Sequence, residues 1–348
     1  MNAPLRPRIV IAGAGHAALV ALEALAREPA EAELVLVSRG PEAHYSGMVP
    51  GWVEGIYPRA AMSIPLAPVC ARAGARLVVG DIVGADAAAL HLADGRALPF
   101  DILVINAGAE TARVGALAGP SVIPAKPFEA LIAGVERTRE DGGDIVVAGG
   151  GVGGVEFALS LAAGRPGRRV RLVERGPCLV PGHPAAFARR LGRALEARGI
   201  AVALGEDVAP DAAETVFAFT GAHPPSFLAA TPFAKAPGGF LAVDTRMRSL
   251  SHRNVLAVGD TATCLADPRP KSGVFSVRAG RPLAAAIRAL AQGEEPPVLR
   301  LQRRGLILAA TGGRRAVGVR NGIVLEGALV WRLKDRLDRG FVARFKGN

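Results

Sequence analysis

The residues best suited to chemistry are glycines that stand between a short apolar strand and a helix. The segment VVAGGGVGGVE (146–156) contains Gly149-x-Gly151-x-x-Gly154. Glycines at this spacing let the backbone turn tightly against a pyrophosphate, and the first N–H groups of the following helix point at the same anion. Twenty residues further on, the next strand ends at Glu174, where a carboxylate can bind an adenosine ribose and repels a 2′-phosphate. This segment therefore predicts a site for NADH in preference to NADPH.

A similar loop stands near the N-terminus. In IVIAGAGHAAL (9–19), Gly13, Gly15 and Ala18 take the same three places, and alanine in the third still allows close packing of helix on strand. The next strand ends in Ser38-Arg39, so the usual acid is missing, although Ser38 can hydrogen-bond a ribose hydroxyl. A glycine-rich turn without a nucleotide is the alternative interpretation. His16 in this loop suits packing or a phosphate edge better than catalysis.

A third motif favours a second nucleotide. The segment NVLAVGD (254–260) is an apolar strand that ends in Gly259-Asp260, a pair that holds the ribityl chain in flavin enzymes with two nucleotide-binding domains. A helix is expected from about Gly273, and its N-terminus would favour negative charge on the pyrimidine edge of a flavin. Together these features predict FAD at the first loop.

The elements that must position these motifs occur twice along the chain. Each loop lies in a strand–loop–helix–strand unit, which argues for parallel sheets. The expected fold class is α/β, with two Rossmann-like domains for FAD and NAD(P), the second inserted into the first, and a small C-terminal α+β segment. The expected domains are 1–118 and 244–295 for FAD, 119–243 for NAD, and 296–348 for the C-terminal strands and helix.

Four further segments carry a family resemblance. They are YSGMVPG (45–51), FTGAHPPSFL (219–228), PKSGVFSVRAGRPLA (270–284) and VWRLKDRLDRGF (330–341). With the two loops, they make the chain resemble flavoproteins of the pyridine nucleotide–disulfide oxidoreductase superfamily. More narrowly, it is similar to the flavoprotein module found fused ahead of selenide, water dikinase, which itself resembles type II NADH dehydrogenases. The kinase is not part of the resemblance, so no selenophosphate synthesis is expected.

The resemblance implies a set of cofactor-binding residues. Tyr45 to Gly51 would line the flavin ring, and the backbone of Ile82 would contact adenine. Glu156 would face the nicotinamide amide, with a solvated helix charge as the alternative, and Lys271 would lie near flavin N1 unless it is a surface lysine. The full set is Gly13, Gly15, Ala18, Ser38, Arg39, Tyr45, Ser46, Gly47, Ile82, Gly108, Gly259, Asp260, Lys271 and Gly273 for FAD, and Gly149, Gly151, Gly154, Glu156, Glu174 and Gly221 for NADH.

These residues predict an FAD-dependent NADH oxidoreductase. Hydride would pass from NADH to the flavin, and electrons on to a quinone or another small acceptor; no side chain is assigned a catalytic role. The alternative is a nucleotide-binding sensor or partner subunit with little turnover. A sulfide:quinone oxidoreductase is less favoured, because it requires Cys178 and Cys264 to meet in space. The three cysteines form no closely spaced pair, so no metal site is expected.

Charge and hydropathy bear on partners and location. No leader and no long uncharged apolar run is apparent, which favours the cytoplasm. Nine of the eleven net positive charges lie in 300–348, so the body is not expected to bind nucleic acid. Residues 328–348 predict a basic amphipathic helix, interrupted at Gly340, whose apolar stripe includes Leu333, Leu337, Phe341 and Phe345. It would either rest peripherally on the inner face of a membrane or dock on the protein itself.

Overall fold

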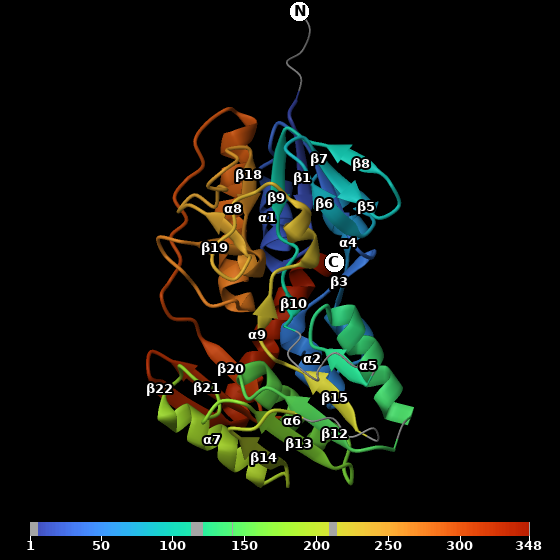
Figure 1. Ribbon diagram of the computed structural model, residues 1–348, viewed down its shortest axis with the longest axis vertical. Coiled ribbons are helices and arrows are strands. Elements are labelled where there is room, and N and C mark those ends of the chain that lie inside the picture. The colour runs from blue at the N-terminus through green and yellow to red at the C-terminus, as the bar shows by residue number, and fades with distance from the viewer. Residues whose placement is uncertain (1–5, 113–120, 141, 209–213, 348) are drawn as a thin grey trace, which may run out of the picture.

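A computed structural model describes residues 6–112, 121–140, 142–208 and 214–347 of the chain. Two parallel sheets with helices packed against them form the two halves of the molecule, one above the other in Figure 1. The predicted α/β class with Rossmann-like sheets is therefore confirmed. The expected boundary at 118/119 lies outside the described residues, and the division at 243/244 and 295/296 stays a prediction.

The first sheet is assembled from two distant parts of the chain. Its strands, in spatial order, are β18 (Val255–Ala257), β9 (Ile102–Ile105), β1 (Arg8–Ala12), β2 (Glu33–Ser38) and β5 (Ala75–Val79). Successive side chains of a strand point to opposite faces. Ile9 and Ile11 accordingly pack in the helix-covered core, whereas Val10 and Ala12 pack in the core on the other face.

Two helices cover one face of this sheet. They are α1 (His16–Arg27) and α8 (Gly273–Ala291), and they lie side by side in Figure 1. A side chain at Gly280 would collide with Val20, so the absence of one lets the two helices approach closely. The opposite face is covered by an antiparallel sheet of β6 (Ile82–Ala85), β7 (Ala89–Leu92) and β8 (Ala97–Pro99).

The second sheet uses only the middle of the chain. Its strands, in spatial order, are β11 (Val122–Pro124), β15 (Thr215–Ala218), β12 (Ile145–Ala148), β13 (Val170–Glu174) and β14 (Ala201–Leu204). Its helices are α5 (Phe128–Glu140), α6 (Val152–Gly164) and α7 (Ala185–Glu196). The order of β12, α6 and β13 repeats that of β1, α1 and β2, so each glycine loop follows a buried strand and opens a helix.

The C-terminal segment packs against both halves. An antiparallel sheet of β20 (Ile307–Ala310), β21 (Ala316–Arg320) and β22 (Ile323–Gly327) contacts α6 and α7. It leads into α9 (Ala328–Lys346), which also reaches elements of the first half. The expected interruption at Gly340 is wrong, because α9 continues through it. A helical glycine costs about 1 kcal/mol, whereas burying each of Phe341 and Phe345 contributes about 1.5–3 kcal/mol.

The remaining elements are short and lie mainly in the connections. They are β3 (Glu42–His44), β4 (Ser63–Pro65), β10 (Glu110–Thr111), β16 (Ala222–His223), β17 (Leu241–Val243), β19 (Ala262–Cys264), α2 (Val49–Val53), α3 (Arg59–Met62), α4 (Leu66–Arg72) and the 3-10 turns η1 (Ser46–Met48), η2 (Ser226–Ala230) and η3 (Gly259–Thr261). Strands β10 and β16 pair with each other, so the two connections between the halves run side by side.

Candidate functional site

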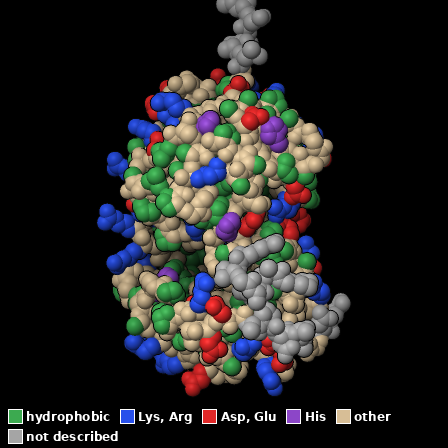
Figure 2. Space-filling view, viewed as in Figure 1, with side chains coloured by type: hydrophobic (Ala, Val, Ile, Leu, Met, Phe, Trp, Pro, Cys, Tyr) green, Lys and Arg blue, Asp and Glu red, His purple; other side chains and the backbone are tan. Residues whose placement is uncertain are grey.

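A cavity of about 300 Å³ opens at the carboxyl ends of all strands of the first sheet. In parallel α/β sheets this edge is where ligands bind. The cavity is bordered by Gly13 to His16 after β1, Ser38 and Arg39 at the end of β2, Gly80 to Ile82 after β5, Asn106 to Glu110 after β9, and Asp260 after β18. The face drawn in Figure 2 is hollowed at the level where the two halves meet.

The first glycine loop forms one wall of the cavity. Gly13 has φ of +100°, and a Cβ there would lie 2.5 Å from the Cα of Ala107. Gly15 is the N-cap of α1 and has no side chain to satisfy the first N–H groups of the helix, which suits an anion such as a pyrophosphate. Ala18 is fully buried, as close helix packing requires.

Asn106 holds this loop in place and was not identified from the sequence. Its buried side chain accepts the N–H of Ala18 at 2.9 Å and donates to the carbonyl of Val258 at 2.7 Å. The loop after β1 is thereby tied to the turn after β18, two segments that both border the cavity. The available signal was a polar residue directly after the apolar run ILVI (102–105).

The Gly259–Asp260 turn brings a carboxylate to the cavity. Gly259 has φ of +75°, and Asp260 accepts a hydrogen bond from the ammonium of Lys126 at 2.6 Å. Lys126, which the sequence analysis did not select, comes from the crossing between the halves and also borders the cavity. Its charge offsets that of Asp260, which would otherwise oppose the pyrophosphate of a dinucleotide bound nearby.

The end of β2 is where an adenosine is expected. Ser38 is buried there, and Arg39 forms ion pairs with Asp81 at 2.8 Å and Glu129 at 3.7 Å. Asp81 follows β5, the neighbouring strand, and borders the cavity beside Ile82. The carboxylate of Asp81 therefore lies near the end of β2, where the sequence has Ser38-Arg39 in place of the usual acid.

Aromatic side chains form another wall of the cavity, next to the first glycine loop. The rings of Tyr45 and Phe341 stack with centroids 4.4 Å apart, and the ring of His16 meets Tyr45 edge-on at 5.4 Å. Ser46 and Gly108 also border the cavity. Gly47 instead turns toward α9, where its carbonyl accepts a hydrogen bond from the ammonium of Lys334.

The unpaired ring nitrogen of His16 bears on whether these residues suit a bound cofactor. Among the described residues none hydrogen-bonds its buried Nε2, although the side chain borders the cavity. Burial lowers the pKa of His16 to about 4, so the ring is neutral near pH 7. A buried nitrogen left unpaired beside a cavity suits a site whose ligand supplies polar atoms. The residues present therefore fit a dinucleotide such as FAD.

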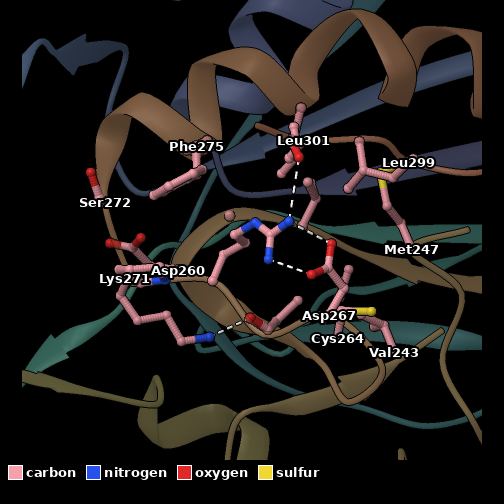
Figure 3. A pocket seen from close by; sticks show the side chains of 18 of the residues that line it. Val243, Met247, Asp260, Cys264, Asp267, Lys271, Ser272, Phe275, Leu299 and Leu301 are labelled. Atoms are coloured by element: carbon pink, nitrogen blue, oxygen red, sulfur yellow. Dashed lines mark hydrogen bonds and ion pairs between the residues drawn. The ribbon is translucent and has the colours of Figure 1, made fainter. Parts of the chain in front are cut away.

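Helix α8 begins at Gly273 beside the cavity, and Lys271, two residues earlier, borders the cavity too. The ammonium of Lys271 donates to the carbonyl of Ala262 and to Oγ1 of Thr263, and it lies over the ring of Phe240. Burial lowers its pKa to about 8. Figure 3 shows it with Asp260 at one end of a second, smaller cavity of about 80 Å³. In this structure its charge is engaged by backbone and hydroxyl oxygens.

The second glycine loop has the same construction as the first. Gly149 has φ of +114°, and a side chain there would collide with the carbonyl of Phe219. Gly151 is the N-cap of α6, and a Cβ on Gly154 would collide with the carbonyl of Gly149. Gly221, with φ of +103°, lies three residues after β15. Close backbone packing explains the glycines at Gly149 and Gly154, and the positive φ explains the one at Gly221.

Glu174 lies over this second loop. Its two carboxylate oxygens accept the N–H groups of Gly150 at 2.5 Å and Gly176 at 2.6 Å. The carboxylate at the end of β13 is thereby held beside the glycines, the arrangement expected of a group that binds a ribose. The adjacent Arg175 is exposed.

Glu156 lies in the interior. Its carboxylate accepts the N–H of Ala310 at 2.7 Å and lies 3.6 Å from the ammonium of Lys334, and its side chain is 14% exposed. The alternative of a solvated helix charge is therefore wrong. The structure brings Glu156 together with α9, which the sequence did not indicate.

The cysteines form no redox pair in this structure. All three, each within the described residues, are free thiols: Cys70 is buried, Cys178 is exposed and Cys264 borders the smaller cavity. Burial raises the pKa of Cys70 to about 11, which keeps it protonated and unreactive near neutral pH.

Solved structures with similar folds come from redox enzymes. Sulfide:quinone oxidoreductase from Aquifex aeolicus matches with a TM-score of 0.79 and 17% identity, covering 97% of this chain and 90% of that one. A ferredoxin reductase from Rhodopseudomonas palustris matches with a TM-score of 0.74 and 18% identity, covering 90% and 81%. The water-forming NADH oxidase from Lactobacillus brevis matches with a TM-score of 0.72 and 19% identity, covering 90% and 74%. At these identities the likeness shows the fold alone.

The sequence itself matches a family model over most of its length. The model of the pyridine nucleotide-disulphide oxidoreductases matches residues 7–280, which include both glycine loops and the Gly259–Asp260 turn. The chain therefore belongs to the pyridine nucleotide-disulphide oxidoreductase family, whose members are NAD(P)H-dependent FAD oxidoreductases.

Proposed function

We propose that this enzyme oxidises NADH and passes the electrons through FAD to a quinone or another small acceptor. FAD, when bound, supplies the two-electron chemistry between the nucleotide and the acceptor. The first glycine loop, Asp260 and the start of α8 would hold FAD, and the second glycine loop with Glu174 would hold NADH. No described side chain needs to form a covalent intermediate in this scheme.

One observation supports this proposal most strongly. The cavity of about 300 Å³ joins the first glycine loop, the Asp260–Lys126 pair and an aromatic wall at one sheet edge, while a second loop of the same construction carries its own acid. Two separate nucleotide-binding loops suit a protein that brings two nucleotides together. The free cysteines argue against a disulfide or sulfide substrate handled by a cysteine pair.

The spectrum of the purified protein tests the proposal. A flavin absorbance that is bleached by NADH under anaerobic conditions, and recovers on addition of a short-chain quinone, is the expected result. A flavin that is bound but not bleached by NADH would favour the sensor or partner subunit instead. Bleaching by sulfide would favour a sulfide:quinone oxidoreductase, as in the structural neighbour from Aquifex aeolicus.

Helix α9 supports a contact with a membrane, where quinones reside. Its stripe divides in two: Phe341 and Phe345 are buried, whereas Leu329, Leu333 and Leu337, hereafter the leucine row, are 76%, 46% and 49% exposed. Ile323 and Leu325 of β22 add exposed apolar surface next to the start of α9, and Arg332 and Arg336 are exposed between the leucines. Exposed apolar groups among arginines suit the surface of an anionic bilayer.

Such a contact would be peripheral. No helix in the described part of the chain has the length and apolar character needed to span a bilayer. Arginines close to anionic lipid contribute about 1 kcal/mol each, so binding would be reversible and weakened by salt. The resemblance to the module that precedes selenide, water dikinase also remains a proposal, which rests on the segments at 45–51, 219–228, 270–284 and 330–341.

A further inference from the structure

Beside the cavity, four ionisable side chains lie together, and two of them, Lys334 and Asp338, are buried. They come from three parts of the chain: Tyr45 precedes η1, Glu156 lies on α6, and Lys334 and Asp338 lie on α9. The Lys334 ammonium is 2.8 Å from the carboxylate of Asp338 and 3.6 Å from that of Glu156. The side chains of Lys334 and Asp338 are each 10% exposed.

The charges in this group do not balance. Lys334 is the ion-pair partner of both carboxylates, so one cation faces two anions when all three groups are ionised. Leaving a surplus charge in a buried site is costly, and such groups usually change protonation instead. Glu156 accepts a hydrogen bond from the N–H of Ala310, and Asp338 interacts with the hydroxyl of Tyr45. Both of these partners are polar but neutral, so they do not remove the surplus charge.

Neighbouring charged groups do not remove it either. On the outer side of α9, Asp335 pairs with Arg339 and accepts the hydroxyl of Tyr57, which makes a neutral set. Across the cavity, Asp260 pairs with Lys126, and His16 is neutral near pH 7. Burial raises the pKa of Glu156 and that of Asp338, while the two carboxylates raise the pKa of Lys334 despite its burial. The proton that restores balance therefore belongs on a carboxylate.

We infer that Glu156 and Asp338 share one exchangeable proton across Lys334, and that the fraction of molecules in which the group holds this proton rises when electrons enter the adjoining cofactor cavity. The inference rests on the proposed FAD site. Tyr45 connects the two places, because its ring borders the cavity while its hydroxyl interacts electrostatically with the carboxylate of Asp338. The proton comes from solvent and forms one O–H bond on a carboxylate; the electrons come from NADH through the cofactor. When electrons leave for the acceptor, the proton is released.

The pH dependence of the flavin midpoint potential tests this inference. For a two-electron couple, each proton bound on reduction adds about 30 mV per pH unit to the slope. The wild-type slope between about pH 6 and pH 9 should exceed that of Glu156→Gln and of Asp338→Asn by this amount. Either substitution leaves one carboxylate paired with Lys334, a neutral pair that has no need of a proton.

Matched variants separate this effect from simple damage. Asp335→Asn, one turn away on α9, should keep the wild-type slope, and Asp338→Glu should restore it. Equal slopes in the wild type and in both flavin-loaded single variants would overturn the inference. The titration uses a chemical reductant and mediator dyes, so its outcome does not depend on whether NADH is the physiological donor.

A second measurement needs no cofactor. The measurement is an infrared difference spectrum of the apoprotein at about pH 9 and at about pH 6. Exposed carboxylates are ionised at both pH values, so they do not contribute to the difference. The wild type and Asp335→Asn should show loss of a protonated carboxyl band at the higher pH, and Glu156→Gln and Asp338→Asn should not. A wild-type spectrum without that band, or one that both variants reproduce, would contradict the shared proton.

Discussion

Acidification should destabilise the protein through His16. The folded state holds the pKa of this residue near 4, against an ordinary value of 6.5, because the ring is buried. A lowered pKa means that the folded state resists protonation while the unfolded state accepts it. The stabilising contribution of the neutral ring is therefore fully present above about pH 6.5 and is lost as the pH falls toward 4.

The size of the effect follows from the shift. A difference of about 2.5 pKa units corresponds to about 3 kcal/mol in the free energy of unfolding, of which about 2 kcal/mol is already lost at pH 5. Because other groups also titrate in this range, the quantity to measure is the difference between the wild type and His16→Gln, which cannot gain a charge.

Urea unfolding of the apoprotein, followed by far-ultraviolet circular dichroism, measures this difference. Between pH 7 and pH 5 the wild type should lose about 2 kcal/mol more than His16→Gln. The half-exposed His91, which pairs with Asp86 on the surface, provides a control in His91→Gln. Parallel pH profiles for the wild type and His16→Gln would refute the reasoning, since they would mean that the folded protein admits a proton at this ring.

Three further predictions concern the cofactors and the membrane. Asp260→Ala should lose flavin during purification, so its visible absorbance per protein should fall; retention at wild-type stoichiometry would contradict the FAD assignment. Glu174→Ala should lower the affinity for NADH roughly 10- to 100-fold, as expected for losing charge-assisted hydrogen bonds worth about 1.5–3 kcal/mol. The affinity for NADPH should fall less. If both nucleotides reduce the wild-type flavin equally well, Glu174 does not bind the ribose. Replacing the leucine row with glutamine should abolish low-salt sedimentation with anionic vesicles while leaving unfolding unchanged, and unaltered sedimentation would exclude this surface.

Local patterns in the sequence were enough to predict much of the fold. The strands at 8–12 and 33–38 lie on either side of the first glycine loop and its helix, as the predicted strand–loop–helix–strand unit requires, because an apolar run bounded by polar or glycine residues is a local signal. The glycine loops were equally accessible, since their spacing reflects contacts within one strand–helix unit. Helix α9 was predicted, but its passage through Gly340 was not, because burial of Phe341 and Phe345 depends on distant elements.

The parts of the site that the sequence did not reveal arise from tertiary contacts. Lys126 lies 134 positions from Asp260 in sequence, and no local pattern pairs them. Asp81 approaches the end of β2 only because β5 is its neighbour in the sheet. The ion pair of Glu156 with Lys334 of α9 is likewise a contact that no local pattern predicts, and the expected place of Glu156 beside the nicotinamide stays a prediction.

The split of the first sheet has a consequence for synthesis on the ribosome. Every strand of the second sheet lies between residues 122 and 218, so that sheet can be complete before β18 (Val255–Ala257) has been translated. Until then β9 is an open edge, and α1 lacks the cover that α8 provides. Domains generally fold as units as they emerge. The inserted half is thus the first able to finish folding, and a nascent chain stalled before residue 255 would expose an unpaired strand prone to aggregation.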